Sequence, residues 1–527
     1  MVFWALVIVV ALVVTVYRWY TASFDYFEKN GIPFVKPFPQ LWALLAKTMH
    51  VNEASALGYD QFREHRVSGM FSFRQPGYLV HDPELVKEIT IKHFDHFTEH
   101  AHTCPVDVDP LLGRALFFMD GQRWKAGRTG LSPAFTGSKM RNMYGLLYGC
   151  IEGAMKRLLE DAKGQSMEKE FRDLTSRIGN DVITSISFGV EIDSVHNLNN
   201  EFYVRGKELA VTDGFQGLKI LLLALVPPTF FRIFGLRVLP KETTNFYFDL
   251  VSKSIQHREK YGINRPDFIT LMLQARKNEL NEDKQEDESA QDAGFSTAQE
   301  HLQSSTETGY YTDEDIAGVT GSFFFGGIET TTTVICFALY EMSLNPDIQR
   351  KLHEEIESTQ NQMDKSDKLS YETLLKLKYL DMVVSETLRK WPPLGVTNRV
   401  CVKPYTLTDY NGAKITVERG QTLQIPIASI HRDVKYYPDP YRFDPERFSE
   451  ENRHKINQAA FLPFGSGPRN CIGSRLALMQ VKCYLYLLLS NFRVEMSQKT
   501  DVPIKLDKGA LTYHATNGFW FHLIPKV

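Results

Sequence analysis

Apolar residues recur with the spacing of amphipathic helices along most of the chain. Helices are predicted at residues 53–66, 83–93, 143–160, 171–188, 312–344, 379–390 and 474–489. Alternation with a period of two at residues 70–80 and 405–426 predicts strands, with turns at Gln75-Pro76-Gly77 and Asn411-Gly412. A last hairpin is expected around Asn517-Gly518. The pattern therefore predicts a fold that is mainly α with small β-sheets.

An apolar run opens the chain. Residues 2–16 are apolar except for Thr15, and the aromatic residues at 17, 19 and 20 extend the run toward the ~20 residues that a membrane span needs. The charges of Arg18, Lys29 and Lys36 follow the run, which favours an uncleaved signal anchor whose C-terminal side lies in the cytosol. A cleaved signal peptide, with its charge before the run, is the alternative. We expect an anchor helix at residues 1–20, a Pro-rich hinge at 21–45 and one folded domain at 46–527.

Three further stretches depart from the helical pattern. Residues 218–226 are strongly apolar and precede Pro227-Pro228, which suits equally a second, interfacial membrane contact and a buried core helix. Residues 277–308 are polar and acidic and are expected to form a mobile loop. Residues 95–119 are irregular and are expected to form a loop.

Composition narrows the class of protein. A chain of 527 residues can bury a large core, and a net charge of −3 without a basic tract gives no indication of nucleic-acid binding. The six cysteines, at positions 104, 150, 336, 401, 471 and 483, form no Cys-x-x-Cys pair and no zinc spacing. A disulfide framework is therefore not expected, and the folded part is assigned to a reducing compartment.

The most specific motif is a Gly-rich loop that runs straight into the predicted helix 474–489: Phe464-Gly465-Ser466-Gly467-Pro468-Arg469-Asn470-Cys471-Ile472-Gly473. Backbone N–H groups and the helix dipole at this position are expected to lower the pKa of the Cys471 thiol. Gly467 and Gly473 allow the backbone to approach a flat ligand closely, and Arg469 is placed to pair with a carboxylate on it. A tight turn that holds a buried cysteine is the alternative.

The long helix at 312–344 contains a run of poor helix formers, Gly326-Gly327-Ile328-Glu329-Thr330-Thr331. Thr312 is its expected N-cap. We expect the backbone to open locally at the glycines, with the Thr330 hydroxyl bonded to the Gly326 carbonyl. Glu329 and Thr330 form an acid–alcohol pair suited to proton delivery, and a kinked core helix is the alternative.

Two further pairs of residues, each spaced so that both members share one face of a helix, are candidates for the functional site or its support. Trp124 and Arg128 share one face of a helix that opens near Gly121, where they are placed to hold one acidic group or to stack on the surface. Glu386 and Arg389 are three residues apart and can pair on one face.

These motifs, in this order, resemble those of the cytochromes P-450, the haem-thiolate monooxygenases. The spacing Phe-x-x-Gly-x-Arg-x-Cys-x-Gly at 464–473 resembles the family's haem-binding loop, and residues 326–331 resemble its oxygen-activation motif. Glu386-x-x-Arg389 is similar to its core pair, with Arg447 in Asp444-Pro445-Glu446-Arg447-Phe448 as the third member. The resemblance covers essentially the whole chain and is closest to insect microsomal, xenobiotic-metabolising members, through Phe24-Asp25-Tyr26-Phe27, Gly31-Ile32-Pro33, residues 385–393 and residues 469–475. One departure is Gly326, where many relatives have Ala.

The resemblance implies a cytochrome P-450 fold with a single catalytic domain at 46–527 and a haem b whose iron is bound by Cys471. It further implies that Gly473 lies against the haem and that Phe464 shields the thiolate. Glu329 and Thr330 would deliver protons, and Glu386, Arg389 and Arg447 are assigned to structure. The implied ligands of the haem propionates are Trp124, Arg128, Arg399 and Arg469.

The resemblance also implies a reaction. One oxygen atom from O2 would enter an apolar small molecule, such as a plant toxin, an insecticide, or an endogenous lipid or hormone. Electrons would come from NADPH through cytochrome P-450 reductase, with cytochrome b5 as a second donor, at the endoplasmic reticulum membrane with the catalytic domain on the cytosolic side. Two alternatives remain: a reductase-independent haem-thiolate isomerase or dehydratase, and a non-enzymatic haem-binding protein.

The resemblance also leads us to expect a substrate pocket and a surface that binds the reductase. Residues 95–119, 214–226 and Phe323-Phe324-Phe325 are expected to shape the substrate pocket. A basic patch of four side chains is expected to receive the reductase: Lys125, Arg128, Arg475 and Lys482.

Overall fold

The computed structural model describes residues 2–37, 48–72, 74–101, 103–210, 219, 226, 228–277, 294–298, 311–364, 367–510 and 512–526. Helices dominate this part of the chain. They are α1 Val2–Thr21, α2 Tyr26–Lys29, α4 Val51–Gln61, α5 Pro83–Lys87, α6 Gly121–Leu131, α7 Gly137–Ala162, α8 Phe171–Phe188, α9 Glu201–Ala210, α11 Pro228–Ile233, α12 Lys241–Tyr261, α13 Phe268–Arg276, α14 Asp313–Gly327, α15 Glu329–Leu344, α16 Pro346–Gln362, α17 Tyr371–Lys376, α18 Lys378–Lys390, α19 Ile427–Ile430 and α20 Ser474–Asn491.

Three small sheets accompany the helices, as the sequence predicts. One has the strand order β1-β2-β7-β4, the second β3-β9-β8, and the third pairs β5 with β6. The strands are β1 Val67–Ser72, β2 Gln75–Val80, β3 Met167–Glu170, β4 Thr397–Val400, β5 Tyr405–Thr408, β6 Lys414–Val417, β7 Thr422–Ile425, β8 Phe492–Met496 and β9 Trp520–Pro525.

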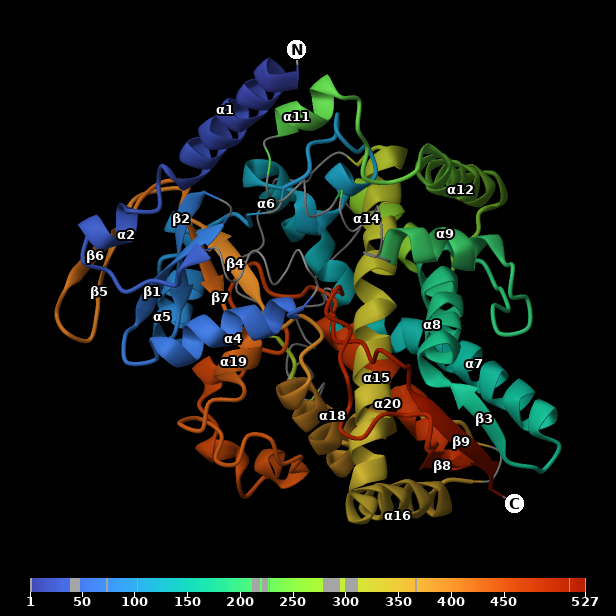
Figure 1. Ribbon diagram of the computed structural model, residues 1–527. Coiled ribbons are helices and arrows are strands. Elements are labelled where there is room, and N and C mark those ends of the chain that lie inside the picture. Colours follow the sequence, from blue (N-terminus) through green and yellow to red (C-terminus); the bar gives the residue numbers. More distant parts are fainter. Residues whose placement is uncertain are drawn as a thin grey trace.

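Helices α14 and α15 run one after the other through the middle of the molecule (Figure 1), with α7, α8 and α9 on one side and the four-stranded sheet on the other. Residues 334–340 of α15 are all buried, which explains why this segment is apolar on every face and not amphipathic. The side chains of α7, α8, α15, α18 and α20 form one large apolar core, and a smaller core lies under the four-stranded sheet.

The sequence predicts the amphipathic helices closely because their boundaries carry local signals. Helix α8 has the predicted bounds, and the Glu170 side chain accepts hydrogen bonds from the first backbone N–H groups of the helix. Thr312 caps α14 as predicted, in a reciprocal capping box with Asp315. Asp82 caps α5, but the helix continues beyond Lys87 as a π-helical turn.

Two strand predictions are wrong in detail. Gln75-Pro76-Gly77 was predicted as a turn, but these residues belong to β2 and pair with β1, so the turn falls earlier. Asn517-Gly518 does not close a terminal hairpin: β9 pairs instead with β3 and β8, which precede it by many residues. Such long-range pairing leaves no local signal in the sequence.

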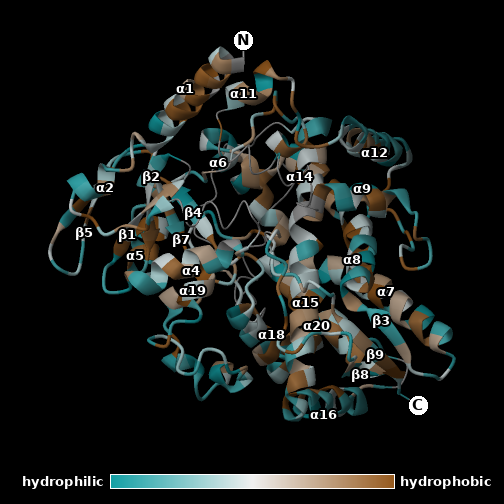
Figure 2. Cartoon of the chain, in the orientation of Figure 1, coloured by the Kyte–Doolittle hydropathy of each residue, from teal (hydrophilic) through white to brown (hydrophobic). Residues whose placement is uncertain are grey.

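The N-terminal region combines an exposed apolar helix with a packed connection. Helix α1 has 20 residues and is largely hydrophobic along its length (Figure 2), and its described apolar side chains are exposed. Among the described residues, two stretches are long and apolar enough to cross a membrane: this one, and the α14–α15 segment, which is mostly buried. Within the predicted hinge, Phe27 is fully buried and Phe34 pairs with Gly69 of β1. Residues 38–47, and with them the predicted boundary at 45–46, lie outside the described residues.

Two further predictions fall largely outside the described part of the chain. Of the apolar stretch 218–226, only residues 219 and 226 are described, and of the polar stretch 277–308 only 277 and 294–298.

Candidate active site

A mostly apolar cavity of about 360 Å³ lies beside the junction of α14 and α15. Its other walls come from α6, α18, α20, the segment 112–118 and the loop that carries Cys471. The cavity brings together nine residues that were predicted from the sequence as site residues: Trp124, Arg128, Glu329, Thr330, Arg399, Phe464, Arg469, Cys471 and Gly473.

The predicted pocket-forming loop contributes much of the apolar wall. Four consecutive residues of the 95–119 segment, Ala115 to Phe118, line the cavity, and so does Phe323 from α14. Phe324 does not: it is fully buried and packs against Phe188 and Tyr247 in the core. Phe323 and Phe324 of α14 therefore face different surroundings, the cavity and the core respectively.

The Cys471 loop is held by its own backbone. The Cys471 N–H donates to the Phe464 carbonyl at 2.9 Å, and the Asn470 N–H donates to the Gly467 carbonyl at 2.9 Å. Gly465 and Gly467 both have φ +75°, a left-handed conformation that favours glycine. The loop ends at Gly473, the N-cap residue of α20, so Cys471 lies just before a helix N-terminus as predicted.

The Cys471 side chain is exposed to the cavity, which itself lies within the protein. Burial raises the pKa of this thiol, although the Gly473 N–H and the charge of Arg128 act in the opposite direction. The expected lowering of the pKa is therefore wrong, because desolvation of the thiolate outweighs the helix N-terminus.

The two predicted glycines differ in what surrounds them. A Cβ on Gly467 would collide with the backbone carbonyl of Thr90, so this glycine is required by packing within the protein. A Cβ on Gly473 would come no closer than 3.9 Å to the nearest neighbour, Phe135. Gly473 therefore borders the open space of the cavity.

Two arginines at the cavity are buried without an anionic partner in the described part of the chain. Arg469 donates to the carbonyls of Thr98 and Met119 at 2.9 and 3.0 Å, and Arg399 donates to those of Asn398 and Ser466 at 2.7 and 3.2 Å. Among the described residues neither forms an ion pair with a carboxylate, and Arg469 Nη2 and Arg399 Nε have no hydrogen-bond partner.

Burial, together with the nearby charge of Arg399, lowers the pKa of Arg469 to about 9, although Glu99 and Asp120 act in the opposite direction. Burial lowers the pKa of Arg399 to about 10. Two desolvated cations with unpaired donors fit a ligand that carries two carboxylates, as haem does.

Trp124 and Arg128 lie on one buried face of α6, as their spacing predicts. The Arg469 guanidinium stacks on the Trp124 ring, 3.8 Å from its centroid. The guanidinium of Arg128 donates to the carbonyl and to the side-chain oxygen of Asn470 at 2.8 and 2.7 Å. Arg128 thus holds the residue that precedes Cys471.

The α14–α15 junction opens where the sequence predicts. Helix α14 ends at Gly327 and α15 begins at Glu329. The Thr330 hydroxyl donates to the Gly326 carbonyl at 2.5 Å, which confirms that prediction.

Glu329 is held by two basic residues that the sequence did not nominate. Arg172 Nη2 donates to Glu329 Oε1 at 2.6 Å, and His514 Nε2 lies 2.6 Å from the same oxygen. Burial opposes ionisation, but the hydrogen bond with His514 and the charge of Arg172 outweigh it and lower the pKa of Glu329 below its ordinary value. No hydrogen bond joins the described side chains of Glu329 and Thr330, so the pair is adjacent but not directly connected.

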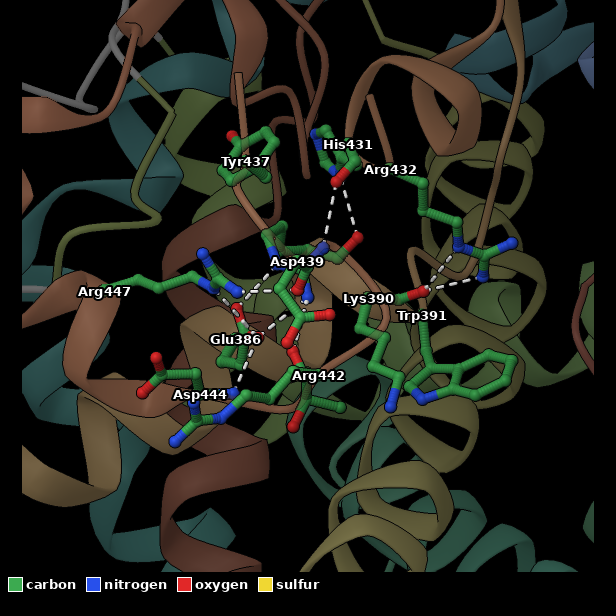
Figure 3. Close-up of polar contacts among 12 residues, drawn as sticks. Glu386, Lys390, Trp391, His431, Arg432, Tyr437, Asp439, Arg442, Asp444 and Arg447 are labelled. Carbon is green, nitrogen blue, oxygen red and sulfur yellow. Dashed lines mark hydrogen bonds and ion pairs between the residues drawn. The ribbon is translucent and has the colours of Figure 1, made fainter. Parts of the chain in front are cut away.

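Glu386 and Arg447 come together as predicted (Figure 3), and Arg389 pairs with the same carboxylate. Arg389 makes a bidentate pair with Glu386 at 2.6 and 2.7 Å, and Arg447 Nε lies 3.6 Å from the same carboxylate. Arg389 also donates to the carbonyl of His431 at 2.9 Å, and the His431 ring bonds to the Leu462 N–H at 2.8 Å. His431, which the sequence did not nominate, therefore links this buried cluster to the segment before the Cys471 loop.

The expected basic patch is wrong for two of its four members. Lys482 is fully buried in an ion pair with Asp381, and Arg128 is buried against Asn470. Arg475 is half-buried and donates to the Phe135 carbonyl, which leaves Lys125 as the exposed member.

Comparison with known proteins gives the class and then the family. The family model described as "Cytochrome P450" matches residues 33–520. "Cytochrome P450 9b2" of Drosophila melanogaster is 36% identical over 520 residues, which cover 97% of each chain. "Cytochrome P450 9e2" of Blattella germanica is 37% identical over 95% of this chain and 94% of its own, and "Cytochrome P450 6k1" of the same species is 32% identical over 98% and 95%.

The protein is thus an oxidoreductase of the haem-thiolate class. It belongs to the cytochrome P450 family, and its activity is that of a monooxygenase, which incorporates oxygen from O2.

Proposed function

We propose that Cys471 is the axial ligand of a haem b that sits in the cavity between the Cys471 loop and the α14–α15 junction. The observation that carries this proposal is that one apolar cavity holds the cysteine, the threonine of the helix break and two buried arginines that have no acidic partner among the described residues. Arg469, Arg399, Trp124 and Arg128 would bind the propionates, Gly473 would leave room for the ring, and Phe464 would shield the thiolate.

When bound, the haem supplies the oxygen-activating iron, to which a thiolate ligand donates electron density. The chain supplies the proton path. Thr330 holds its hydroxyl at the edge of the cavity through the Gly326 carbonyl, where it can pass a proton to a cavity-bound water or ligand. Glu329 is kept ionised by Arg172 and His514, so it would act in this path by accepting a proton from outside and releasing it toward Thr330.

The substrate would be an apolar small molecule, such as a plant toxin, an insecticide, or an endogenous lipid or hormone. The wall formed by Leu112, Ala115–Phe118 and Phe323 offers few hydrogen bonds, which favours apolar ligands.

Electrons would come from NADPH through cytochrome P450 reductase, with cytochrome b5 as a second donor. The exposed apolar helix α1 supports an anchor in the endoplasmic reticulum membrane with the catalytic domain on the cytosolic side. Phe230, Ile233 and Phe234, at and just beyond α11, are exposed as well and support a second contact with lipid.

Reconstituted turnover tests the proposal. The full chain with reductase should consume NADPH and oxygenate an apolar substrate, whereas Thr330→Ala should keep NADPH consumption but divert electrons from product to peroxide or water. Thr408→Ala, at a threonine in β5 away from the cavity, is the matched control. Turnover that persists without NADPH and reductase would overturn the proposal in favour of an isomerase or dehydratase.

A further inference from the structure

A short segment between α13 and α14 is docked against the far side of two cavity-lining helices. This segment, residues 294–298, is called the plug below. The Phe295 N–H donates to Asp381 Oδ2 of α18 at 3.1 Å, and the Ser296 hydroxyl lies 2.8 Å from that of Ser385, one helical turn along. The Thr297 N–H donates to the Gly294 carbonyl at 3.1 Å, so the plug is a closed turn.

The first residue of the plug has to be glycine. Gly294 has φ +114°, and a Cβ at this position would collide with the Asp381 carboxylate and lie 2.9 Å from Lys482 Nζ. Asp381 and the fully buried Lys482 of α20 form an ion pair at 2.7 Å. The plug therefore closes over a buried ion pair and satisfies the second oxygen of its carboxylate through the Phe295 N–H.

The second residue of the plug completes an aromatic cluster. The Phe295 ring lies 5.3 Å from Phe448 and 5.5 Å from Phe461, and these two rings are 5.1 Å apart. Phe461 also stacks on His431 at 5.5 Å. Contacts of this kind favour one arrangement of the rings beyond the apolar area that they bury.

The aromatic cluster leads directly into the Cys471 loop. Leu462, next to Phe461, donates its N–H to His431, and Phe464 accepts the hydrogen bond from the Cys471 N–H. On the other side, α18 and α20 present Val384 and Val481 to the cavity. The plug thus contacts the segment before the Cys471 loop and lies against α18 and α20, two of the helices that line the cavity.

We propose that the plug is an internal positioning peptide that holds the backbone from Phe461 to Phe464 in the arrangement that directs Cys471 into the cavity. The proposal rests on the proposed role of Cys471 as the haem ligand. Phe295 is its principal positioning residue, acting through Phe461, and Gly294 and Ser296 fix the turn on α18.

The reduced-CO spectrum of the full-length holoprotein tests the proposal, together with amide hydrogen exchange of residues 456–464. In Phe295→Ala the thiolate-type Soret band should convert to the thiol type several-fold faster than in the wild type on mild warming, and exchange at 456–464 should rise. Phe295→Leu keeps an apolar side chain, so its conversion rate and its exchange should lie between those of the wild type and of Phe295→Ala. It serves as the test variant if the alanine variant does not fold.

A double-mutant cycle separates positioning from general destabilisation. In a Phe461→Leu background, Phe295→Ala should accelerate the conversion far less than in the wild type. The contact between the rings of Phe295 and Phe461 is already lost in that background, so removing the second ring has less effect. Tyr261→Ala, at an aromatic residue that is 60% exposed at the end of α12, should leave both readouts unchanged.

The outcomes distinguish the plug from the haem site. A wild type without the thiolate-type band would contradict the role of Cys471. If the wild type shows that band but Phe295→Ala has unchanged conversion and exchange, only the proposed role of the plug is overturned. Fully additive effects of Phe295→Ala and Phe461→Leu would overturn that role as well.

Discussion

Buried charges at the cavity are partnered in two different ways. Glu329 has Arg172 and His514 within 2.6 Å, so its charge is compensated inside the protein. Arg469 and Arg399 bond only to backbone carbonyls among the described residues. Burying a cation without an anion costs stability, so this arrangement is understandable only if an anionic ligand completes it.

Replacing Arg469 with Leu is expected to weaken haem retention. Loss of one charge-assisted contact, worth about 1.5–3 kcal/mol, corresponds to roughly 10- to 100-fold faster haem release. Transfer of haem to an excess of apomyoglobin measures the rate. Arg419→Leu, at an exposed arginine between β6 and β7, should release haem at the wild-type rate. Equal rates in all three proteins would contradict a propionate contact.

Glu329→Gln is expected to lower the free energy of unfolding by about 1–3 kcal/mol at pH 7, because a charged hydrogen bond is replaced by a neutral one. The pKa of Glu329 in the folded state is lowered from its ordinary 4.5, so the unfolded state binds the proton more tightly than the folded state. The carboxylate therefore makes its full contribution to the free energy of unfolding above pH 4.5 and loses it as the pH falls. The difference from the wild type should therefore stay constant between pH 7 and pH 5 and fall only at lower pH. Denaturant unfolding at the two pH values measures it. A difference that already shrinks by pH 5 would show that Glu329 titrates above its ordinary range.

The sequence predicts the members of the site better than their partners. Cys471, Thr330 and Arg469 belong to local motifs with fixed spacing, and all three line the cavity. Arg172 and His514 lie 157 and 185 residues from Glu329, and a contact across such separations leaves no local spacing to detect. The direction of the Cys471 pKa was also out of reach, since it depends on how much protein surrounds the sulfur.

At the scale of elements, the junction of α14 and α15 positions the chemistry. The two adjacent glycines at this junction meet different surroundings. A Cβ on Gly326 would have no neighbour within 4 Å, whereas one on Gly327 would lie 2.8 Å from Ile183 Cδ1, in a fully buried side chain. Both glycines therefore border the cavity, but a methyl group on Gly327 would have to displace the side chain of Ile183.

Gly326→Ala should raise the free energy of unfolding by about 0.5–1 kcal/mol, because alanine favours a helix and the added methyl group enters open space. Gly327→Ala should lower it by about 1–3 kcal/mol through overpacking against α8. Denaturant unfolding measures the free energy of unfolding of both variants, which carry the same substitution at neighbouring positions. A Gly327→Ala variant more stable than Gly326→Ala would contradict the packing of α8 on α14.

Element prediction succeeded where periodic apolar residues or local end signals mark a helix, and it failed where partners are distant. Helices α8 and α20 were predicted at or near their observed bounds, although residues 178–188 and 478–489 are buried throughout. The pairing of β9 with β3 and β8 was missed, because no tight turn connects β9 to either strand and β3 precedes it by several hundred residues. The plug was missed as well, since its five residues are recognisable only by the side chains that they contact.

At the scale of the whole molecule, exposed apolar residues cluster along α1 and at the end of α11, and others are scattered over the surface. The two helices lie near one another at the top of Figure 1. Trp19 at the end of α1 is fixed to the body, since Arg74 stacks on its ring at 4.3 Å. A single membrane surface can therefore receive both features.

Deletion of residues 2–18, which spares Trp19, should leave the cavity intact but reduce membrane binding, measured by flotation with liposomes. Adding Ile233→Ser and Phe234→Ser should release the remaining bound fraction, since both side chains are exposed, by 74% and 62%. Leu198→Ser, at an exposed leucine away from α11, is the control. Unchanged flotation after the deletion would contradict the anchor.

The reduced-CO difference spectrum of the purified holoprotein tests the central claim most directly. The wild type should show the Soret band of a thiolate-ligated haem, and Cys471→Ser should lose that band, while Cys483→Ser, at a buried cysteine on α20, should keep it. A thiolate-type band that survives Cys471→Ser, or a wild type that never shows one, would contradict the assignment of Cys471 as the haem ligand.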